Sequence, residues 1–170
     1  GISFKGRYEP RKIKQNNQKM KIQITKFKGL YIVKQKDNSD KRGSLRETFN
    51  EKIIKKKFVF EYCTHSKKNV LRGFHFQTKS KQSKFVNVLK GKILDVVVDL
   101  RMGTNFGKVY STYLDSNSSD TIFIPKGFGH SFLNLEQNQA VLLYLVETEH
   151  DPINDTGVLW NSVDYNWPIN

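Results

Sequence analysis

Residues 70–100 read VLRGFHFQ-TKSKQS-KFVNVL-KGK-ILDVVVDL, and this stretch decides the fold class. Its three apolar segments, at 70–77, 84–89 and 93–100, are separated by a polar loop and by a tight glycine-containing turn. Short runs rich in Val, Phe and Ile between turn residues are typical of β-strands, and a helix would need a longer 3.6-residue period. The stretch therefore predicts adjacent short strands of an antiparallel sheet.

The same pattern continues on both sides of this stretch. It predicts a turn at 37–40, an exposed helical turn at 51–57, and further strands at 21–25, 29–33, 58–64, 108–114, 120–124, 130–135 and 140–147. Many short strands without long helices predict an all-β antiparallel sandwich or barrel. The aromatic tail at 164–168 is expected to pack back on the body of this domain, which we place at 21–170.

Composition narrows the classes of protein that this chain can be. Its 170 residues, 37% of them hydrophobic, can supply the core of one domain. We find no apolar run near the ~20 residues that a membrane helix needs and no apolar signal-peptide segment. The single cysteine, Cys63, excludes an internal disulfide framework and favours a reducing, cytoplasmic location.

The net charge of +13 suggests a protein that binds nucleic acid, but the distribution of the charge along the chain weakens this interpretation. Residues 1–68 hold 20 Lys and Arg against 6 Asp and Glu, whereas residues 69–170 hold 9 against 10. Most of the basic residues are lysines, which bind phosphate as point charges and with less geometric specificity than the planar guanidinium of arginine. We interpret residues 1–20 as a basic flexible arm or linker without chemistry of its own, and nucleic-acid binding as the weaker alternative.

Two histidines stand out among the four. On a strand, His75 shares a face with Gln77 while Phe74 and Phe76 point the other way, as expected for a strand that lines a polar cavity. A sheet with one solvated face explains the same pattern at least as well. His130 follows a Gly/Pro-rich loop at the start of an apolar strand, where a structural histidine is the simpler interpretation.

Other kinds of site find little support. A metal site is disfavoured, because Gln77 stands where a cupin-type His-x-His pair would need its second histidine. Nucleophile-elbow, Walker and dinucleotide-binding motifs are absent. Asp95 and Asp99 share one face of an apolar strand. The more common explanation is a structural ion pair with Lys84, Arg72 or Arg101, and the more specific one is a carboxylate of an active site.

Several motifs occur together in one order and spacing. They are Arg42-Gly-x-x-x-Glu-x-Phe49, VLRGFHFQ at 70–77, KFV at 84–86, DVVVDLR at 95–101, Phe106-Gly107, IPKGFGHSF at 124–132, Leu143-Tyr144 and Trp167-Pro168. Over residues 22–168 this set closely resembles the dTDP-4-dehydrorhamnose 3,5-epimerases, the epimerase branch of the cupin superfamily. The resemblance implies a cupin jelly roll with short peripheral helices. It also implies a homodimer that acts on a nucleotide-linked 4-keto-6-deoxy sugar, without metal or cofactor, in dTDP-rhamnose and polysaccharide biosynthesis.

The resemblance also implies roles for individual residues. His75 would be the base, Tyr144 the acid on the opposite face of the sugar, and Lys84 the cation beside the 4-keto oxygen. Asp95 would hold Lys84, and His130 and Gln77 would line the same cavity. Substrate contacts would come from Arg72 and Arg42 at the diphosphate, from Glu47 on the nucleotide side, and from His150.

Some positions depart from the family pattern. Family members often carry a second active-site tyrosine where this chain has His150, and a base-binding Gln-x-Asn where it has Tyr62-Cys-Thr64. They also continue past Trp-Pro to a Ser-x-Lys-Asp segment whose aspartate orients the catalytic histidine, and this sequence ends at Asn170 before such a segment. If that end is natural, we expect His130, Gln77 or an internal carboxylate to orient His75. These departures keep open a 3,4-ketoisomerase or a catalytically weakened sugar-nucleotide-binding module.

Overall fold

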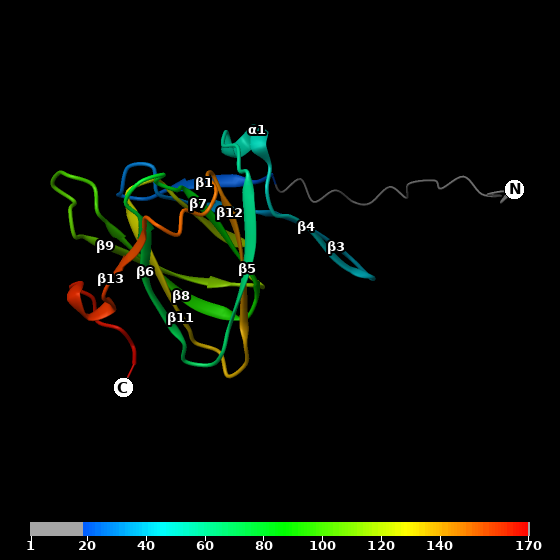
Figure 1. The fold of residues 1–170 in the computed structure, drawn as a ribbon. Coiled ribbons are helices and arrows are strands. Elements are labelled where there is room, and N and C mark those ends of the chain that lie inside the picture. The colour runs from blue at the N-terminus through cyan, green and yellow to red at the C-terminus, as the bar shows by residue number, and fades with distance from the viewer. Residues whose placement is uncertain (1–18, 170) are drawn as a thin grey trace, which may run out of the picture.

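The computed structural model describes residues 19–169, and two antiparallel β-sheets packed face to face dominate it (Figure 1). The six-stranded sheet holds, in spatial order, β1 (Lys21–Ile24), β2 (Tyr31–Lys34), β10 (Asp120–Ile124), β7 (Lys84–Lys90), β12 (Ala140–Val146) and β5 (Phe60–Ser66). The five-stranded sheet holds β13 (Asp155–Val158), β6 (Leu71–Gln77), β11 (Phe128–Asn134), β8 (Lys92–Asp99) and β9 (Val109–Asp115). From β5 to β8 and from β10 to β13 the chain changes sheet at every strand, which is the connectivity of a jelly roll. The all-β prediction is confirmed.

The main core lies between the two sheets, where alternate strand residues meet. Val86 and Val88 of β7 point into it together with Val97 of β8 and Phe132 of β11. Phe85, which precedes Val86 on β7, instead packs on the outer face of the six-stranded sheet, in a cluster with Ile54. Both faces of the central strands are therefore buried, which explains why their sequences are apolar almost throughout.

The outer face of the five-stranded sheet is covered by the C-terminal tail. Trp167 packs against Phe74, with ring centroids 6.1 Å apart, and Leu94, Val96 and Leu133 complete this layer. The tail also contains the short 3₁₀ helix η1 (Trp160–Ser162). The prediction that the aromatic tail packs back on the domain is confirmed.

A two-stranded hairpin, β3 (Lys36–Asp40) and β4 (Gly43–Glu47), projects away from the body (Figure 1). The sequence predicted a turn at 37–40, and this was wrong because those residues pair with 43–47 and the turn falls at Lys41 and Arg42. An ion pair between Asp37 and Arg46, 3.0 Å long, joins the two strands. At the base of the hairpin, the Gln35 side chain donates to the carbonyl of Thr48 at 3.0 Å and to the Asn87 side chain of β7.

The only α-helix of the described residues is the single turn α1 (Glu51–Ile54), which the Asn50 side chain caps by accepting from the Lys52 amide. It lies within the helical turn predicted at 51–57. Residues 19–169 contain no helix that is long and apolar enough to cross a membrane. Of the predicted arm 1–20, residues 1–18 lie outside the described range, and Met20 is buried against Val33 and Ile54.

Candidate active site

His75 lies on β6, between the edge strand β13 and β11 in the five-stranded sheet, and directly opposite His130 of β11. Residues paired across antiparallel strands point to the same face, so His130, which is buried, places both imidazoles on the side of the space between the sheets. His75 itself is exposed at the mouth of this space. Of the two interpretations that the sequence left open for His75, the register supports the face toward the cavity over a fully solvated one.

A β-bulge in β6 brings Arg72 to the same face as His75. His75 pairs with His130, but Phe132, two residues along β11, pairs with Arg72, three residues back along β6. The bulge adds one residue to β6 and so reverses the alternation of side chains along it. His75 and Arg72, three residues apart, therefore point to the same face of the sheet. The Arg72 guanidinium donates through Nε to the Ser66 hydroxyl at 2.9 Å. Simple alternation would have turned Arg72 away from His75.

Asp95 bonds to His130 and not to Lys84, which corrects the expectation drawn from the family resemblance. His130 Nε2 lies 2.7 Å from Asp95 Oδ2, and both side chains are buried. The strands explain the pairing, because Asp95 of β8 and His130 of β11 lie on adjacent strands of one sheet, whereas Lys84 belongs to the other sheet. The second acid, Asp99, pairs with Arg101 at 2.7 Å, which is the structural ion pair expected from the sequence.

Tyr144 faces this group from the opposite sheet. It lies on β12, is buried, and stacks on Tyr62 of β5 with ring centroids 4.7 Å apart and planes within 7° of parallel. Its ring also meets the imidazole of His130 edge-on, at 5.8 Å. The site thus lies between the two sheets, with His75 and His130 on one wall and Tyr144 on the other.

Lys84 begins β7 and enters the site from the same sheet as Tyr144. Burial lowers the pKa of its ammonium below 10.5, and the carboxylate of Asp155 opposes this effect. The positive charge of Lys84 in turn lowers the pKa of the His75 imidazole, because it disfavours protonation of the ring. The structure therefore brings together His75, His130, Asp95, Arg72, Tyr144 and Lys84.

The protonation states that result suit acid–base chemistry. Burial lowers the pKa of His75 below 6.5, so its imidazole is neutral at pH 7 and can accept a proton. Burial raises the pKa of Tyr144 well above 10, and the neighbouring Tyr62 and Asp95 raise it further, so its phenol keeps its proton. One wall of the site thus offers a base and the other an acid.

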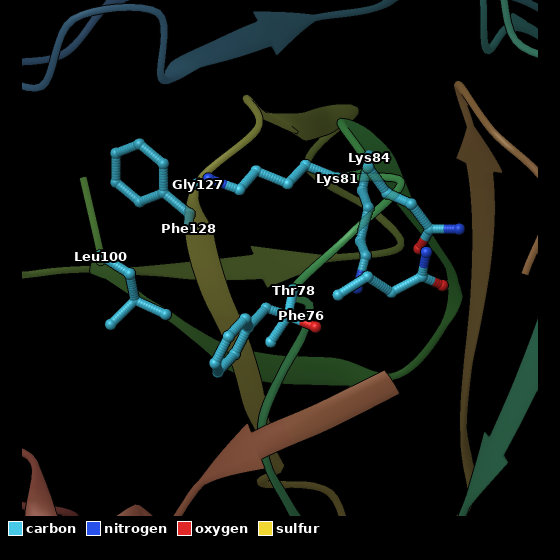
Figure 2. A pocket seen from close by; sticks show the side chains of 9 residues that line it. Phe76, Thr78, Lys81, Lys84, Leu100, Gly127 and Phe128 are labelled. Carbon is cyan, nitrogen blue, oxygen red and sulfur yellow. The ribbon is translucent and has the colours of Figure 1, made fainter. Parts of the chain in front are cut away.

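A pocket of about 220 Å³ opens at the end of the sandwich where Lys84 begins its strand (Figure 2). Phe76, Leu100 and Phe128 form apolar walls, and Lys81 and Lys84 enter from the other side. A pocket with apolar walls and two cations is suited to an organic anion or to a polarised carbonyl group. Of the residues assigned to the site, Lys84 and Gln77 line this pocket, whereas His75, His130 and Tyr144 do not.

Gln77 and His150 lie near the rim of the site. Gln77 is buried, its amide nitrogen donates to the carbonyl of Ser80, and its amide oxygen accepts from the backbone of Asp151, so it ties two rim loops together. His150 is exposed in the second of these loops. The binding roles of both residues stay predictions, and the side chain of Gln77 is already engaged with the protein backbone.

Arg42 and Glu47 are not brought to the site of their own chain. Both lie on the projecting hairpin, Arg42 in its turn and Glu47 at the end of β4 (Figure 1). Arg42 forms an ion pair with Asp40 at 2.5 Å, and Glu47 accepts from the Asn50 side chain at 2.6 Å. Within one chain, the structure therefore does not bring these two predicted substrate contacts to the site.

Two residues of the site were missed as functional groups. Tyr62 stacks on Tyr144, and its place on the inner face follows from the alternation of β5, a signal that the sequence contained. Asp155 lies in the polar stretch 148–157, where only pairing with β6 creates a strand, so the sequence carried no local signal for it. Among residues 19–169, no group of three or more His, Cys, Asp or Glu side chains is arranged to hold a metal ion.

Comparison with known proteins gives a consistent family. Residues 24–169 match the family model described as dTDP-4-dehydrorhamnose 3,5-epimerase. The curated enzyme of that name from Methanothermobacter thermautotrophicus is 35% identical over 153 residues, which cover 85% of this chain and 82% of that enzyme. The Bacillus anthracis epimerase crystal structure, with TDP and PPi bound, matches with a TM-score of 0.85 and 30% identity, over 89% of this chain and 92% of that one. The Legionella pneumophila epimerase in complex with dTDP-4-keto-L-rhamnose matches with a TM-score of 0.84 and 31% identity, over 89% and 85%.

Proposed function

The chain belongs to the dTDP-4-dehydrorhamnose 3,5-epimerase family, and from this membership we propose that it inverts carbon 3 and carbon 5 of a nucleotide-diphosphate-linked 4-keto-6-deoxy sugar. Relatives with dTDP-linked sugars bound, such as the Legionella enzyme, favour dTDP as the nucleotide. The reaction is an isomerisation that proceeds without metal or cofactor, since the 4-keto group itself acidifies the C–H bonds on both sides of it.

The proposed chemistry is a proton transfer on each of two carbons. Neutral His75 takes the proton from the carbon, and the electrons of the broken C–H bond move into an enolate whose oxygen faces the Lys84 ammonium. Tyr144 then forms a new C–H bond from the opposite face of the ring. The imidazolium loses its proton to solvent and the phenolate regains one, which restores both groups for the second carbon.

The observation that carries this proposal is the position of His75 and Tyr144 on facing sheets. His75 belongs to β6 of the five-stranded sheet and Tyr144 to β12 of the six-stranded sheet. His130 links them, because it pairs with His75 across the strands and its ring contacts the ring of Tyr144. A sugar ring held between the sheets has a base on one face and an acid on the other. Inversion needs this arrangement, because removal and return on the same face restore the original centre.

Substrate binding is proposed to involve both the site itself and a second subunit. Arg72 is proposed to bind the diphosphate, supported by its position on the same face as His75 and by the fit of a guanidinium to phosphate oxygens. Arg42 and Glu47 lie on a hairpin that projects from the body, so in a homodimer the hairpin of one subunit can supply them to the site of the other. His150 and Gln77 would complete the rim.

We retain the cytoplasm as the location, on the basis of the one cysteine, Cys63, which is free and exposed. Nucleic-acid binding stays the weaker alternative, because the net charge of residues 69–170 is slightly negative. A DNA-binding assay at several salt concentrations would separate it from the enzyme, whose substrate binding needs no long polyanion.

Proton NMR in deuterated water with dTDP-4-keto-6-deoxyglucose tests the proposed function. We expect deuterium to enter at carbon 3 and carbon 5 and the inverted sugar to accumulate. Exchange at carbon 3 alone would restrict the activity to one carbon. A product with the keto group moved to carbon 3 would identify a 3,4-ketoisomerase, and tight binding without exchange would identify a binding module, and both results would contradict the proposal.

A further inference from the structure

The edge strand β13 presents one side chain, that of Asp155, to the inner side of the five-stranded sheet. Asp155 pairs with Gln77 and Gly157 pairs with His75, so both point to the face that carries His75. Val158 points the other way and packs in the outer layer with Phe74. Because residue 157 is glycine, Asp155 is the nearest side chain on β13 that can reach the His75 imidazole.

Asp155 acts electrostatically on groups from three different strands. Its carboxylate raises the pKa of His75 on β6, of Lys84 on β7 and of Tyr62 on β5, whose pKa burial and Asp155 together raise to about 12. Strand β5 is at one edge of its sheet and β13 is at one edge of the other. The register therefore places Asp155 at the edge of the five-stranded sheet, on the face that carries His75.

The other titratable groups that face His75 work in the opposite direction. Lys84 from β7, His130 from β11 and Arg72 from β6 all lower the pKa of His75, as does burial, which is the largest effect. Lys84 is also destabilised as a cation by its burial. The proposed chemistry needs a charged lysine beside a neutral base. Burial and nearby positive charge both favour loss of the lysine proton, so a negative charge is needed to keep the ammonium protonated.

We propose that Asp155 is the positioning carboxylate of this site, the counter-charge that keeps the Lys84 ammonium protonated beside the His75 imidazole. Its role in turnover rests on the proposed function, but its role as a counter-charge does not. Asp155 is exposed to solvent, so it can act in this way without the cost of a buried charge.

The first test is a pH titration by NMR of the full chain without substrate, following the His75 ring and ¹³C-labelled lysine side chains. In Asp155→Asn, we expect the midpoints of His75 and Lys84 both to move to lower pH by about 0.5–1 unit, the low end for a neighbouring charge because Asp155 is exposed. Asp155→Glu keeps the charge and should restore most of the shift. Asp164→Asn, which removes an exposed carboxylate from the C-terminal tail, is the matched control and should shift neither group.

The second test is the pH profile of kcat for the same variants. His75 must be neutral and Lys84 charged, so both limbs of the profile should move to lower pH in Asp155→Asn, and kcat on the alkaline limb should fall about three- to tenfold. A rise in KM with an unmoved profile would make Asp155 a substrate contact only and overturn the proposal. Unmoved titrations in Asp155→Asn, or equal effects of Asn and Glu, would overturn it as well. Shifted titrations in a protein that turns over no 4-keto sugar would instead refute the proposed function alone.

Discussion

At the scale of single residues, His75 is the proposed base, and its replacement by asparagine removes the proton acceptor while keeping a polar side chain. We expect His75→Asn to reduce deuterium incorporation at carbon 3 and carbon 5 by about 10²–10⁴-fold, the contribution usual for general base catalysis. Proton NMR in deuterated water measures both positions. His65→Asn, an exposed histidine on β5, should exchange at the wild-type rate. Wild-type exchange in His75→Asn would eliminate His75 as the base.

Tyr144→Phe separates proton removal from proton return. The ring that stacks on Tyr62 at 4.7 Å is kept, and only the buried hydroxyl is lost. We expect deuterium to enter at carbon 3 while epimerised product forms at least about 100-fold more slowly. The exposed Tyr113→Phe serves as the control. Equal losses of exchange and of epimerisation would mean that Tyr144 positions the substrate and does not donate the proton.

At the scale of elements, the pairing of β13 with β6 decides where Asp155 lies. A Cβ atom at Gly157 would come within 2.8 Å of the Phe74 carbonyl oxygen, so Gly157→Ala has to push the strands apart. We expect a loss of about 1–3 kcal/mol in the free energy of unfolding, or roughly 2–4 °C in Tm per kcal/mol. Amide hydrogen exchange should show the opening at residues 155–158 first.

The glycine on the partner strand gives a matched comparison. A Cβ atom at Gly73 would lie 3.8 Å from the Val158 carbonyl oxygen, which is an ordinary contact. Gly73→Ala should therefore leave the protection of the β13 amides unchanged. If the two variants had the same Tm and the same exchange pattern, the pairing of β13 with β6 would not depend on the absence of a side chain at Gly157.

At the scale of the whole molecule, the projecting hairpin predicts a homodimer in which each site takes Arg42 from the other chain. We therefore expect an inactive His75→Asn subunit and a weak Arg42→Ala subunit to complement each other. In a mixed dimer, one of the two sites combines an intact His75 with an intact Arg42. Random mixing of equal amounts makes half of the dimers mixed, so about a quarter of the wild-type activity should return.

A second mixture controls for this result. His75→Asn with Tyr144→Phe should recover nothing, because both residues lie in one barrel and no mixed dimer contains an intact site. Light scattering after size exclusion gives the mass of each species. A monomer, or no recovery in the first mixture, would place Arg42 outside the substrate site.

The sequence by itself determined the class of fold and most of the elements in it. The strands predicted at 84–89, 93–100, 120–124 and 140–147 lie at or within a residue or two of β7, β8, β10 and β12. These predictions hold because alternation and turn residues are local properties of the chain. The family motifs also selected six residues that the fold does bring together, including His75 and Tyr144.

Only the tertiary structure decided how those residues face and pair. The bulge that turns Arg72 toward His75 depends on the register between β6 and β11, which no local pattern encodes. Asp95 bonds to His130 and not to Lys84 because adjacent strands of one sheet hold the first two, and strand order is a long-range property. Residues 155–158 form a strand only because β6 offers a free edge, and this pairing is what carries Asp155 to the site.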